Sequence, residues 1–162
     1  SNATNPFEYV AELSKTKALD VLEQMDYKAL IIAADTIITM DDKIYEKPKS
    51  KEEAKNNLLE MSGRTTTAIT GMTIIDMEQD IIITSSDSVD ISFKEIPEED
   101  IDWYIENDPY ILDRCGYSLV GKASLFVNKI EGDYNIAVGL SLNKLHDAIK
   151  QLGYKLNDIE LK

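Results

Sequence analysis

The feature that most constrains the fold is an apolar run that holds a single carboxylate. Residues 29–38 read ALIIAADTII, with four isoleucines and only Asp35 and Thr36 as polar interruptions. A run of this length and composition is typical of a strand buried on both faces. An aspartate in such a strand is costly unless it is paired, hydrated or bound to a cation. Asp35 is therefore either a functional carboxylate held by the strand or a turn cap after a strand that ends at Ala34.

The rest of the chain alternates between helical and extended patterns. Apolar residues at three- and four-residue steps indicate helices, and Thr-, Ile- and Val-rich segments indicate strands. Capping signals at Ser50 with Glu53, at Pro97 and at Ser141 mark helix starts. The predicted elements are a helix over 6–25, strands 29–38 and 43–45, a helix over 51–60, a hairpin of 65–76 and 81–93, a helix after 97, strands 123–130 and 134–138, and a last helix with Leu142, Leu145, Ile149 and Leu152 facing inward. This pattern predicts one α/β domain with a mixed sheet.

Composition excludes several classes of protein. A chain of 162 residues has the length of about one domain, and 1 Cys and 1 His provide neither an internal disulfide nor a histidine-based zinc site. The net charge of −13 repels duplex nucleic acid and anionic bilayers. Because no apolar run approaches the roughly 20 residues that span a bilayer, we expect a cytoplasmic protein. Residues 1–3 look like a remnant of an expression tag, and we expect residues 4–162 to form the domain.

Three basic residues are candidates for binding an anion near Asp35. Lys47 precedes Pro48 and lies across the predicted hairpin from Asp35, so the return of the chain could bring the ammonium near the carboxylate. Lys17 lies at the edge of the apolar face of the first helix, and Arg64 follows the Ser-Gly pair that ends the second. Each also has a structural interpretation: a solvated lysine beside a stiff loop, a lysine whose stem covers apolar surface, and a basic residue at a helix end.

Other side chains of interest lie in the C-terminal third of the chain. Asp108 and Asp113 are close enough in sequence to hold a divalent cation through oxygen ligands, although loop acids in an acidic protein are usually hydrated. Cys115 follows Arg114, which could lower the pKa of the thiol, but a buried inert thiol is the commoner case. His146 lies within the last predicted helix, where packing is a more frequent role than catalysis.

The order of short motifs carries more information than any one of them. The series runs Ala-Ala-Asp-Thr (33–36), Glu-Lys-Pro (46–48), Glu-Glu-Ala (52–54), Ser-Gly-Arg (62–64), Thr-Gly (70–71), Ser-Phe (92–93), Ile101 with Tyr104 and Ile105, Asp-Pro (108–109), Asp-Arg-Cys-Gly-Tyr (113–117), Glu-Gly-Asp-Tyr (131–134) and Val-Gly-Leu (138–140). This set resembles the Maf family of nucleoside triphosphate pyrophosphatases, once named for septum formation. The resemblance covers roughly residues 6–154.

The resemblance implies an activity, a fold and a set of site residues. The activity is hydrolysis of a nucleoside triphosphate to the monophosphate and pyrophosphate with a divalent cation, Mg²⁺ or Mn²⁺. The fold is a two-lobed, Maf/ITPase-like single domain with a curved mixed sheet flanked by helices. Asp35 corresponds to the family's proton acceptor, Lys47 to its lysine before proline and Lys17 to a lysine on the preceding helix. Thr36 corresponds to a position linked to base selection and suggests dTTP or UTP as substrate, with modified nucleotides as the alternative.

Further expectations concern the metal, the substrate and the oligomer. Asp108 and Asp113 are expected to assist Asp35 in holding the metal, and Arg64 to contact the substrate. Val120 stands where the family has a base-reading glutamine, and its side chain can neither donate nor accept a hydrogen bond. Family members open with a strand and a phosphate-binding Ser-x-Ser-Pro-Arg-Arg loop, and we expect this chain to begin after that segment. By family habit a homodimer is expected.

Three readings of the function remain open. In the first, the chain is a nucleoside triphosphate pyrophosphatase, weak or inactive in an N-terminally truncated form. In the second, it is a catalytically degenerate homologue that binds nucleotide or a protein partner without turnover. In the third, it is an acidic α/β domain whose motif order reflects ancestry alone.

Overall fold

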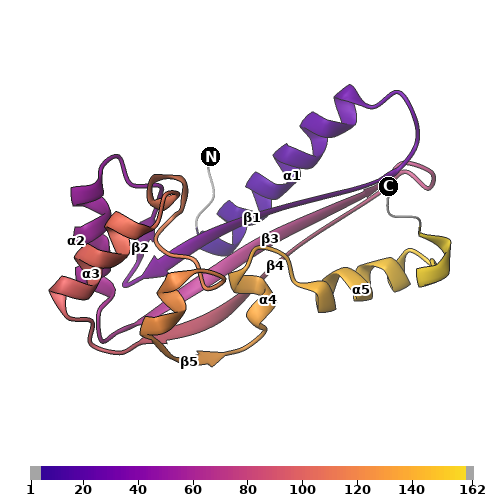
Figure 1. The fold of residues 1–162 in the computed structure, drawn as a ribbon. Helices are drawn as coiled ribbons and strands as arrows, with labels where there is room; N and C mark the ends of the chain where they lie inside the picture. The colour runs from indigo at the N-terminus through magenta and orange to yellow at the C-terminus, as the bar shows by residue number, and fades with distance from the viewer. Residues whose placement is uncertain (1–4, 160–162) are drawn as a thin grey trace.

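The computed structural model describes residues 5–159, which form one sheet with helices on both faces (Figure 1). The helices and strands are α1 (Pro6–Gln24), β1 (Leu30–Met40), β2 (Lys43–Tyr45), α2 (Lys51–Met61), β3 (Thr65–Asp76), β4 (Ile81–Phe93), α3 (Glu98–Asn107), β5 (Val127–Glu131), α4 (Tyr134–Ala137) and α5 (Leu142–Gln151). Three short 3₁₀ helices cover Ile111–Asp113, Lys122–Phe126 and Leu156–Asp158. The predicted single α/β domain is confirmed, and the residues ascribed to a tag lie outside the described range.

The sheet has five strands in the order β2-β1-β3-β4-β5, and every pairing between described strands is antiparallel. The expected mixture of parallel and antiparallel pairs is therefore not found in residues 5–159. After β1 the chain turns back through β2 and passes through α2, so it enters β3 from the end at which it left β1. This connection makes the central pair antiparallel.

Two hairpins match their sequence predictions closely. The β1–β2 loop consists of Asp41 and Asp42, with φ of 50° and 62°. Positive φ at both loop positions is the geometry that a two-residue turn needs to match the twist of the strands. The β3–β4 hairpin has the predicted bounds, and its register begins at Asp76 opposite Ile81. Local turn chemistry therefore defines both hairpins.

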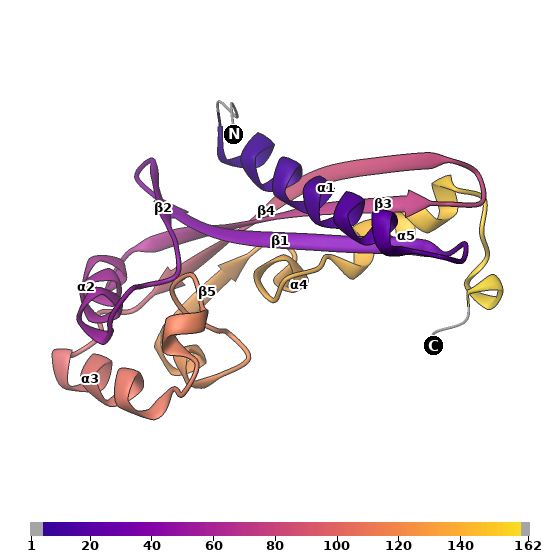
Figure 2. The same ribbon diagram turned by 90° about the horizontal axis from the view of Figure 1, so that it is seen from above.

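Helix α1 lies along one face of the sheet, and α4 and α5 lie on the other (Figures 1 and 2). The Asn5 side chain caps α1 by accepting a hydrogen bond from the Glu8 amide at 2.9 Å. At Gly71 of β3 the helix backbone comes so close that an added Cβ would stand 2.2 Å from the Val10 carbonyl oxygen. The missing side chain at this position therefore sets how closely α1 can approach the sheet.

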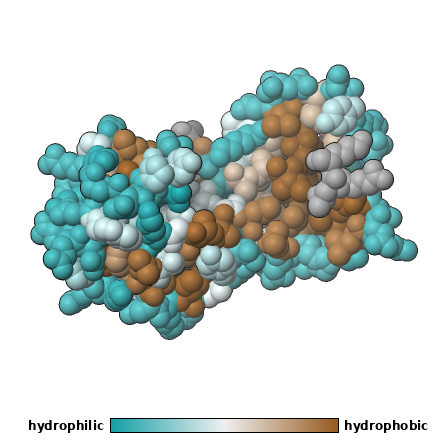
Figure 3. Space-filling model, in the orientation of Figure 1, coloured by the Kyte–Doolittle hydropathy of each residue, from teal (hydrophilic) through white to brown (hydrophobic). Residues whose placement is uncertain are grey.

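The outer edge of β1 is largely open. β2 pairs only with the last three residues of β1, so the stretch from Leu30 to Ile37 has no partner strand on that side within the described residues. Apolar side chains gather between α1 and α5 in this half of the molecule, whereas the opposite end is mostly hydrophilic (Figure 3). Asp35 lies on the open stretch of β1 and can be reached from outside the sheet.

The largest cluster of buried side chains lies at the other end of the molecule, where α2 and α3 pack together. Its members include Leu58 and Met61 of α2 and Tyr104 of α3, each no more than 1% exposed. Ile101 and Ile105 are buried with them, which confirms the predicted inner face of this helix. The Ser50 side chain accepts a hydrogen bond from the Glu53 amide at 3.1 Å, as the capping signal predicts.

The C-terminal part departs from the predicted strands. Residues 122–126 form a 3₁₀ helix and only Val127–Glu131 is extended, and the predicted strand over 134–138 is wrong because this segment is helix α4. The Asp133 side chain caps α4 by accepting from the Asn135 amide at 2.9 Å, and it also accepts from the Ser141 hydroxyl at 2.6 Å. These side-chain bonds favour a helical turn over a returning strand.

Helix α5 begins at Ser141, whose hydroxyl accepts from the Lys144 amide at 3.2 Å as predicted. Ile149 and Leu152 are buried against the sheet and Leu145 is partly buried, in agreement with the expected inner face. Leu142 is 57% exposed, so its predicted inward position is wrong. The helix meets the sheet only after its first turn.

Candidate functional site

A pocket of about 340 Å³ opens beside β1 at Asp35. It is lined by Tyr9 and Leu13 of α1, Asp35, Thr36 and Ile37 of β1, the segment from Ile44 to Lys47, and Cys115. Its volume lies within the range of about 300–1,000 Å³ that is usual for small-molecule sites. Segments as far apart in the sequence as Tyr9 and Cys115 meet here, so the pocket exists only in the folded protein.

Asp35 is held in this pocket by the sheet and paired with a lysine of α1. Its register partner on β3 is Gly71, which lets α1 lie close above this point of the sheet. The Lys17 ammonium donates to Asp35 Oδ1 at 2.8 Å, and the two side chains are 55% and 24% exposed. Asp35 Oδ2 receives no hydrogen bond from residues 5–159. One carboxylate oxygen is therefore oriented by a cation while the other is left for a ligand.

Lys47 lines the same pocket as Asp35. Ile38 of β1 pairs with Tyr45 of β2, and the chain continues past β2 in the same direction along β1. Continuing this antiparallel path by two residues carries Lys47 back toward Asp35. The hairpin return proposed from the sequence thus brings Lys47 to the pocket lined by Asp35, the carboxylate that Lys17 binds.

The Thr36 hydroxyl is engaged in a hydrogen-bond chain through the sheet. Its oxygen lies 2.7 Å from the Thr70 hydroxyl, which donates to the Ile136 carbonyl at 2.7 Å. Because Thr70 uses its only proton on that carbonyl, the Thr36 hydroxyl is the donor between the two threonines. Thr36 lines the pocket, and its hydroxyl is directed to Thr70 and the α4 side of the sheet.

Two residues expected to contact substrate lie elsewhere. Arg64, between α2 and β3, forms an ion pair with Asp41 in the β1–β2 turn, and this contact raises the pKa of the guanidinium. Val120 is 74% exposed on the loop before the second 3₁₀ helix. Neither residue lines the Asp35 pocket. The family resemblance linked both to the substrate, but the sequence did not show which direction their segments take in space.

The residues expected to complete a metal site with Asp35 do not line this pocket either. Asp108 is buried, accepts from the Tyr110 amide at 3.0 Å and lies 3.8 Å from Arg114 Nε. Asp113 is exposed at the end of the 3₁₀ helix Ile111–Asp113. Within residues 5–159 no group of three or more His, Cys, Asp or Glu side chains is arranged to hold a metal ion. Asp108 is instead used in local contacts.

Sequence reasoning missed several lining residues. Glu46 stood in a quoted motif, but nothing in its spacing distinguished it from a solvated acid. Cys115 is half-buried at the pocket, and burial raises the pKa of its thiol, which the nearby Lys47 offsets only in part. Burial and then a hydrogen bond to Glu60 raise the pKa of Tyr45 to about 12. Neither Cys115 nor Tyr45 is thus prepared to ionise near neutral pH.

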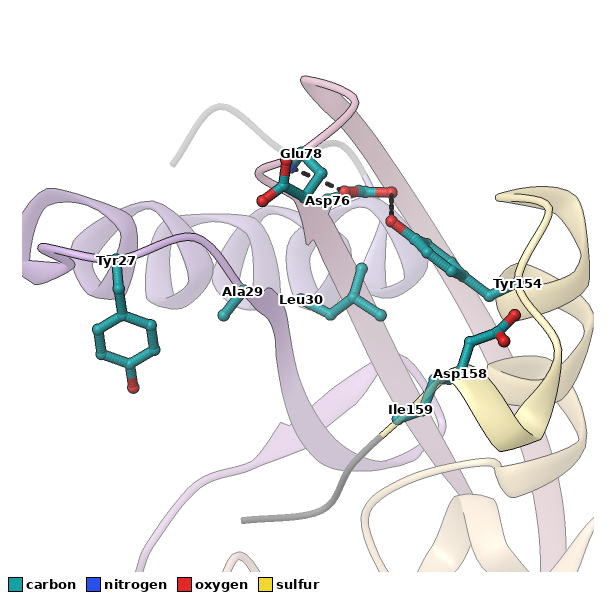
Figure 4. Close-up of a pocket in the computed structure, with 8 residues that line it drawn as sticks. All are labelled: Tyr27, Ala29, Leu30, Asp76, Glu78, Tyr154, Asp158 and Ile159. Carbon is teal, nitrogen blue, oxygen red and sulfur yellow. Dashed lines mark hydrogen bonds between the residues drawn. The ribbon is translucent and has the colours of Figure 1, made fainter.

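A second pocket, of about 310 Å³, lies at the far end of the sheet (Figure 4). Its one buried carboxylate, Asp76, is 1% exposed and accepts from the amides of Glu78 and Gln79 at 2.9 and 3.1 Å. The Gln79 side-chain amide and the Tyr154 hydroxyl bind its other oxygen at 2.6 and 2.9 Å. Asp76 therefore joins the β3–β4 turn to the segment after α5, and both of its oxygens are already bonded.

The hydrogen bonds to Asp76 predict that the stability of the fold depends on pH. Burial by itself raises the pKa of Asp76, but the Tyr154 hydroxyl and the Gln79 and Glu78 donors outweigh it and hold the pKa below its usual value. A carboxyl with a lowered folded-state pKa stabilises the fold above its unfolded pKa, about 3.9. This contribution to stability is lost as the pH falls through the folded-state pKa of Asp76.

Tyr154→Phe is therefore expected to reduce the free energy of unfolding at pH 7 by about 1.5 kcal/mol, the effect of one hydrogen bond to a charged group. The deficit should narrow as the pH is lowered from 7 toward 2, through the lowered folded-state pKa of Asp76. Urea denaturation at both pH values measures it, with Tyr110→Phe as control because that ring is 58% exposed. A deficit of equal size at both pH values would contradict the role assigned to the ionised carboxylate.

The described part of the chain contains no helix long and apolar enough to cross a membrane.

Comparison with known proteins identifies the family of this chain. A family model described as Maf-like protein matches residues 1–152. The dTTP/UTP pyrophosphatase of Clostridium botulinum (strain Alaska E43 / Type E3) is 38% identical over 146 residues, 89% of this chain and 77% of that protein. The dTTP/UTP pyrophosphatase of Clostridium perfringens (strain SM101 / Type A) is 36% identical over 143 residues, 88% and 74% of the two chains. That of Thermoanaerobacter sp. (strain X514) is 34% identical over 151 residues, 93% and 79%. With a family model matched over most of its length and relatives at this identity, the chain belongs to the Maf family.

Proposed function

We propose that this chain hydrolyses a nucleoside triphosphate to the monophosphate and pyrophosphate, with Asp35 as the proton acceptor. The observation that carries the proposal is the Lys17–Asp35 ion pair at a pocket that Asp35 and Lys47 both line. A carboxylate and two lysines gathered in this way can serve both a proton transfer and a polyphosphate chain. The names of the curated relatives support dTTP and UTP as the substrate class.

In this proposal Asp35 removes a proton from the attacking water. Its Oδ1 is fixed by Lys17, while Oδ2 is left to accept from that water. A carboxylate placed in this way contributes about 10²–10⁴ in rate as a general base. The rigidity of β1 keeps this oxygen in position, because both neighbours of Asp35 in the run, Ala34 and Thr36, are bonded into the β1–β3 ladder.

Lys17 and Lys47 provide the positive charge that phosphoryl oxygens require. Fixed charges aimed at the oxygens on which charge develops supply much of the catalysis of phosphoryl transfer. Lys17 binds Asp35 from α1, and Lys47 lines the pocket from the segment after β2, so the two basic side chains come from different elements. Both are needed because the protein as a whole, at a net charge of −13, repels a triphosphate.

The pocket also fits a divalent cation, Mg²⁺ or Mn²⁺, which belongs to the proposed reaction. Asp35 and Glu46 both line it and would supply two carboxylate ligands. Mg²⁺ in phosphoryl-transfer sites is usually held by one or two carboxylates together with substrate phosphates, so a larger protein cage is not required. When bound, such an ion neutralises charge on the phosphoryl oxygens.

The test is pyrophosphate release from dTTP, UTP, dCTP, ATP and GTP with Mg²⁺ or Mn²⁺. We expect pyrophosphate to be released faster from dTTP and UTP than from the other nucleotides. No release is expected when the cation is removed by EDTA. If no nucleotide yields pyrophosphate with either cation, the proposed hydrolysis is refuted.

The same samples distinguish hydrolysis from nucleotide binding without turnover. A rise in melting temperature with nucleotide but no pyrophosphate release would identify a binding protein instead of an enzyme. The homodimer, the cytoplasmic location and the N-terminal truncation remain predictions.

A further inference from the structure

Helix α1 presents two parallel rows of side chains, and the first is used for packing. Val10, Ser14 and Ala18 follow each other at four-residue steps, and all are 0% exposed. The Ser14 hydroxyl lies 2.9 Å from the Thr73 hydroxyl of β3. This row holds α1 on the sheet and so fixes the rotation of the helix about its axis.

The second row lies one residue earlier along the chain and faces the Asp35 pocket. Tyr9, Leu13 and Lys17 are also spaced by four residues, which places them on one side of a helix over about 12 Å of its axis. Tyr9 and Leu13 line the pocket, and Lys17 holds Asp35. The same helix therefore carries a cation at one end of the row and an aromatic ring at the other.

The two ends of the pocket differ in chemistry. At the level of Asp35 and Lys47 the wall is charged. At the level of Tyr9 the wall is apolar, because Tyr9 and Ile44 both pack against the buried cluster that contains Ile37 of β1. A nucleoside triphosphate has the same polarity along its length, with charged phosphates at one end and a flat aromatic base at the other. Only one orientation matches both ends.

We propose that Tyr9 is the platform on which the base of the nucleotide stacks, with Leu13 beside it and the phosphates directed to Lys17 and Lys47. This inference rests on the proposed function and adds a residue that determines substrate affinity. Tyr9 packs against the cluster that contains Ile37, so little conformational entropy is lost when a base covers the other side of its ring. Stacking tolerates every base, so this contact gives affinity for nucleotides over plain polyphosphate.

The test compares a nucleotide with a ligand that lacks a base. Tyr9→Ala is expected to raise KM for dTTP about 10-fold, within the range that loss of one base–aromatic stack produces, and to change kcat little. The inhibition constant of inorganic tripolyphosphate, measured against dTTP, should stay at the wild-type value. Tyr9→Phe, which keeps the ring, should restore most of the lost affinity.

Phe7→Ala is the matched control, because Phe7 is an aromatic residue of α1 that is 41% exposed and does not line the pocket. Its KM for dTTP should equal that of the wild type. The inference is overturned if KM is unchanged in Tyr9→Ala, or if tripolyphosphate binding weakens by the same factor as dTTP binding. Absence of turnover in the wild type would instead refute the proposed function, so the two failures are distinct.

Discussion

Asp35→Asn is expected to reduce kcat for pyrophosphate release by about 10²–10⁴-fold, because an amide cannot accept the proton of the attacking water. The fold should survive the change, since the Lys17–Asp35 pair is partly exposed and such pairs contribute only about 0–1 kcal/mol to stability. Steady-state kinetics with dTTP measure the loss, and thermal melting should show a shift of only a few degrees.

Asp42→Asn provides the control for the loss of one negative charge. Asp42 is exposed in the β1–β2 turn with φ of 62°, a conformation that asparagine also adopts readily. Its kcat should therefore match the wild type. Full activity in Asp35→Asn would refute the assignment of the base while leaving the family membership intact.

Gly71→Ala is expected to destabilise the protein by about 3 kcal/mol, the upper part of the usual range for overpacking. The added Cβ would stand 2.2 Å from the Val10 carbonyl oxygen, and this obstacle is helix backbone that cannot rotate away. Helix α1 must therefore move off the sheet. At roughly 2–4 °C per kcal/mol for a chain of this size, the melting temperature should fall by about 6–12 °C.

The same change should reduce activity, because α1 carries Lys17 and its displacement alters the 2.8 Å contact with Asp35. Gly121→Ala is the matched control: its φ is −118° and an added Cβ would meet only ordinary contacts, the nearest at 3.6 Å. That variant should melt within about 2 °C of the wild type, since unstrained surface changes are usually worth less than about 0.5 kcal/mol. Equal melting temperatures of Gly71→Ala and Gly121→Ala would show that the packing of α1 on the sheet does not depend on its close approach at Gly71.

Much of the fold follows from short-range signals. The β3–β4 hairpin has its predicted bounds because the strands on both sides of a four-residue connection are rich in β-branched residues, and Ser50 begins α2 with the hydrogen bond that its spacing predicts. The segment after Asp133 shows where such signals fail. Its apolar pattern suits a strand, but the Asp133 carboxylate binds both the Asn135 amide and the distant Ser141 hydroxyl, and a helical turn results.

The candidate site was likewise predictable from the sequence only in part. Asp35 could be singled out because a carboxylate within an apolar run requires a partner, and Lys47 because a hairpin reverses the chain. Arg64 looked equally suitable, yet it pairs with Asp41 in the β1–β2 turn and does not line the Asp35 pocket. Tyr9 gave no signal at all, since an aromatic residue near the start of an amphipathic helix is ordinary until the rotation of that helix is known.

The sequence alone determined the position of the buried strand, the acid within it and the local turns. These features depend on steric and solvation preferences within a few residues. Lys17 and Asp35 are 18 residues apart in the sequence, and they meet only because α1 docks on the sheet at Gly71, which has no side chain. Docking is governed by the shapes of surfaces far apart in sequence, and no local preference encodes those shapes.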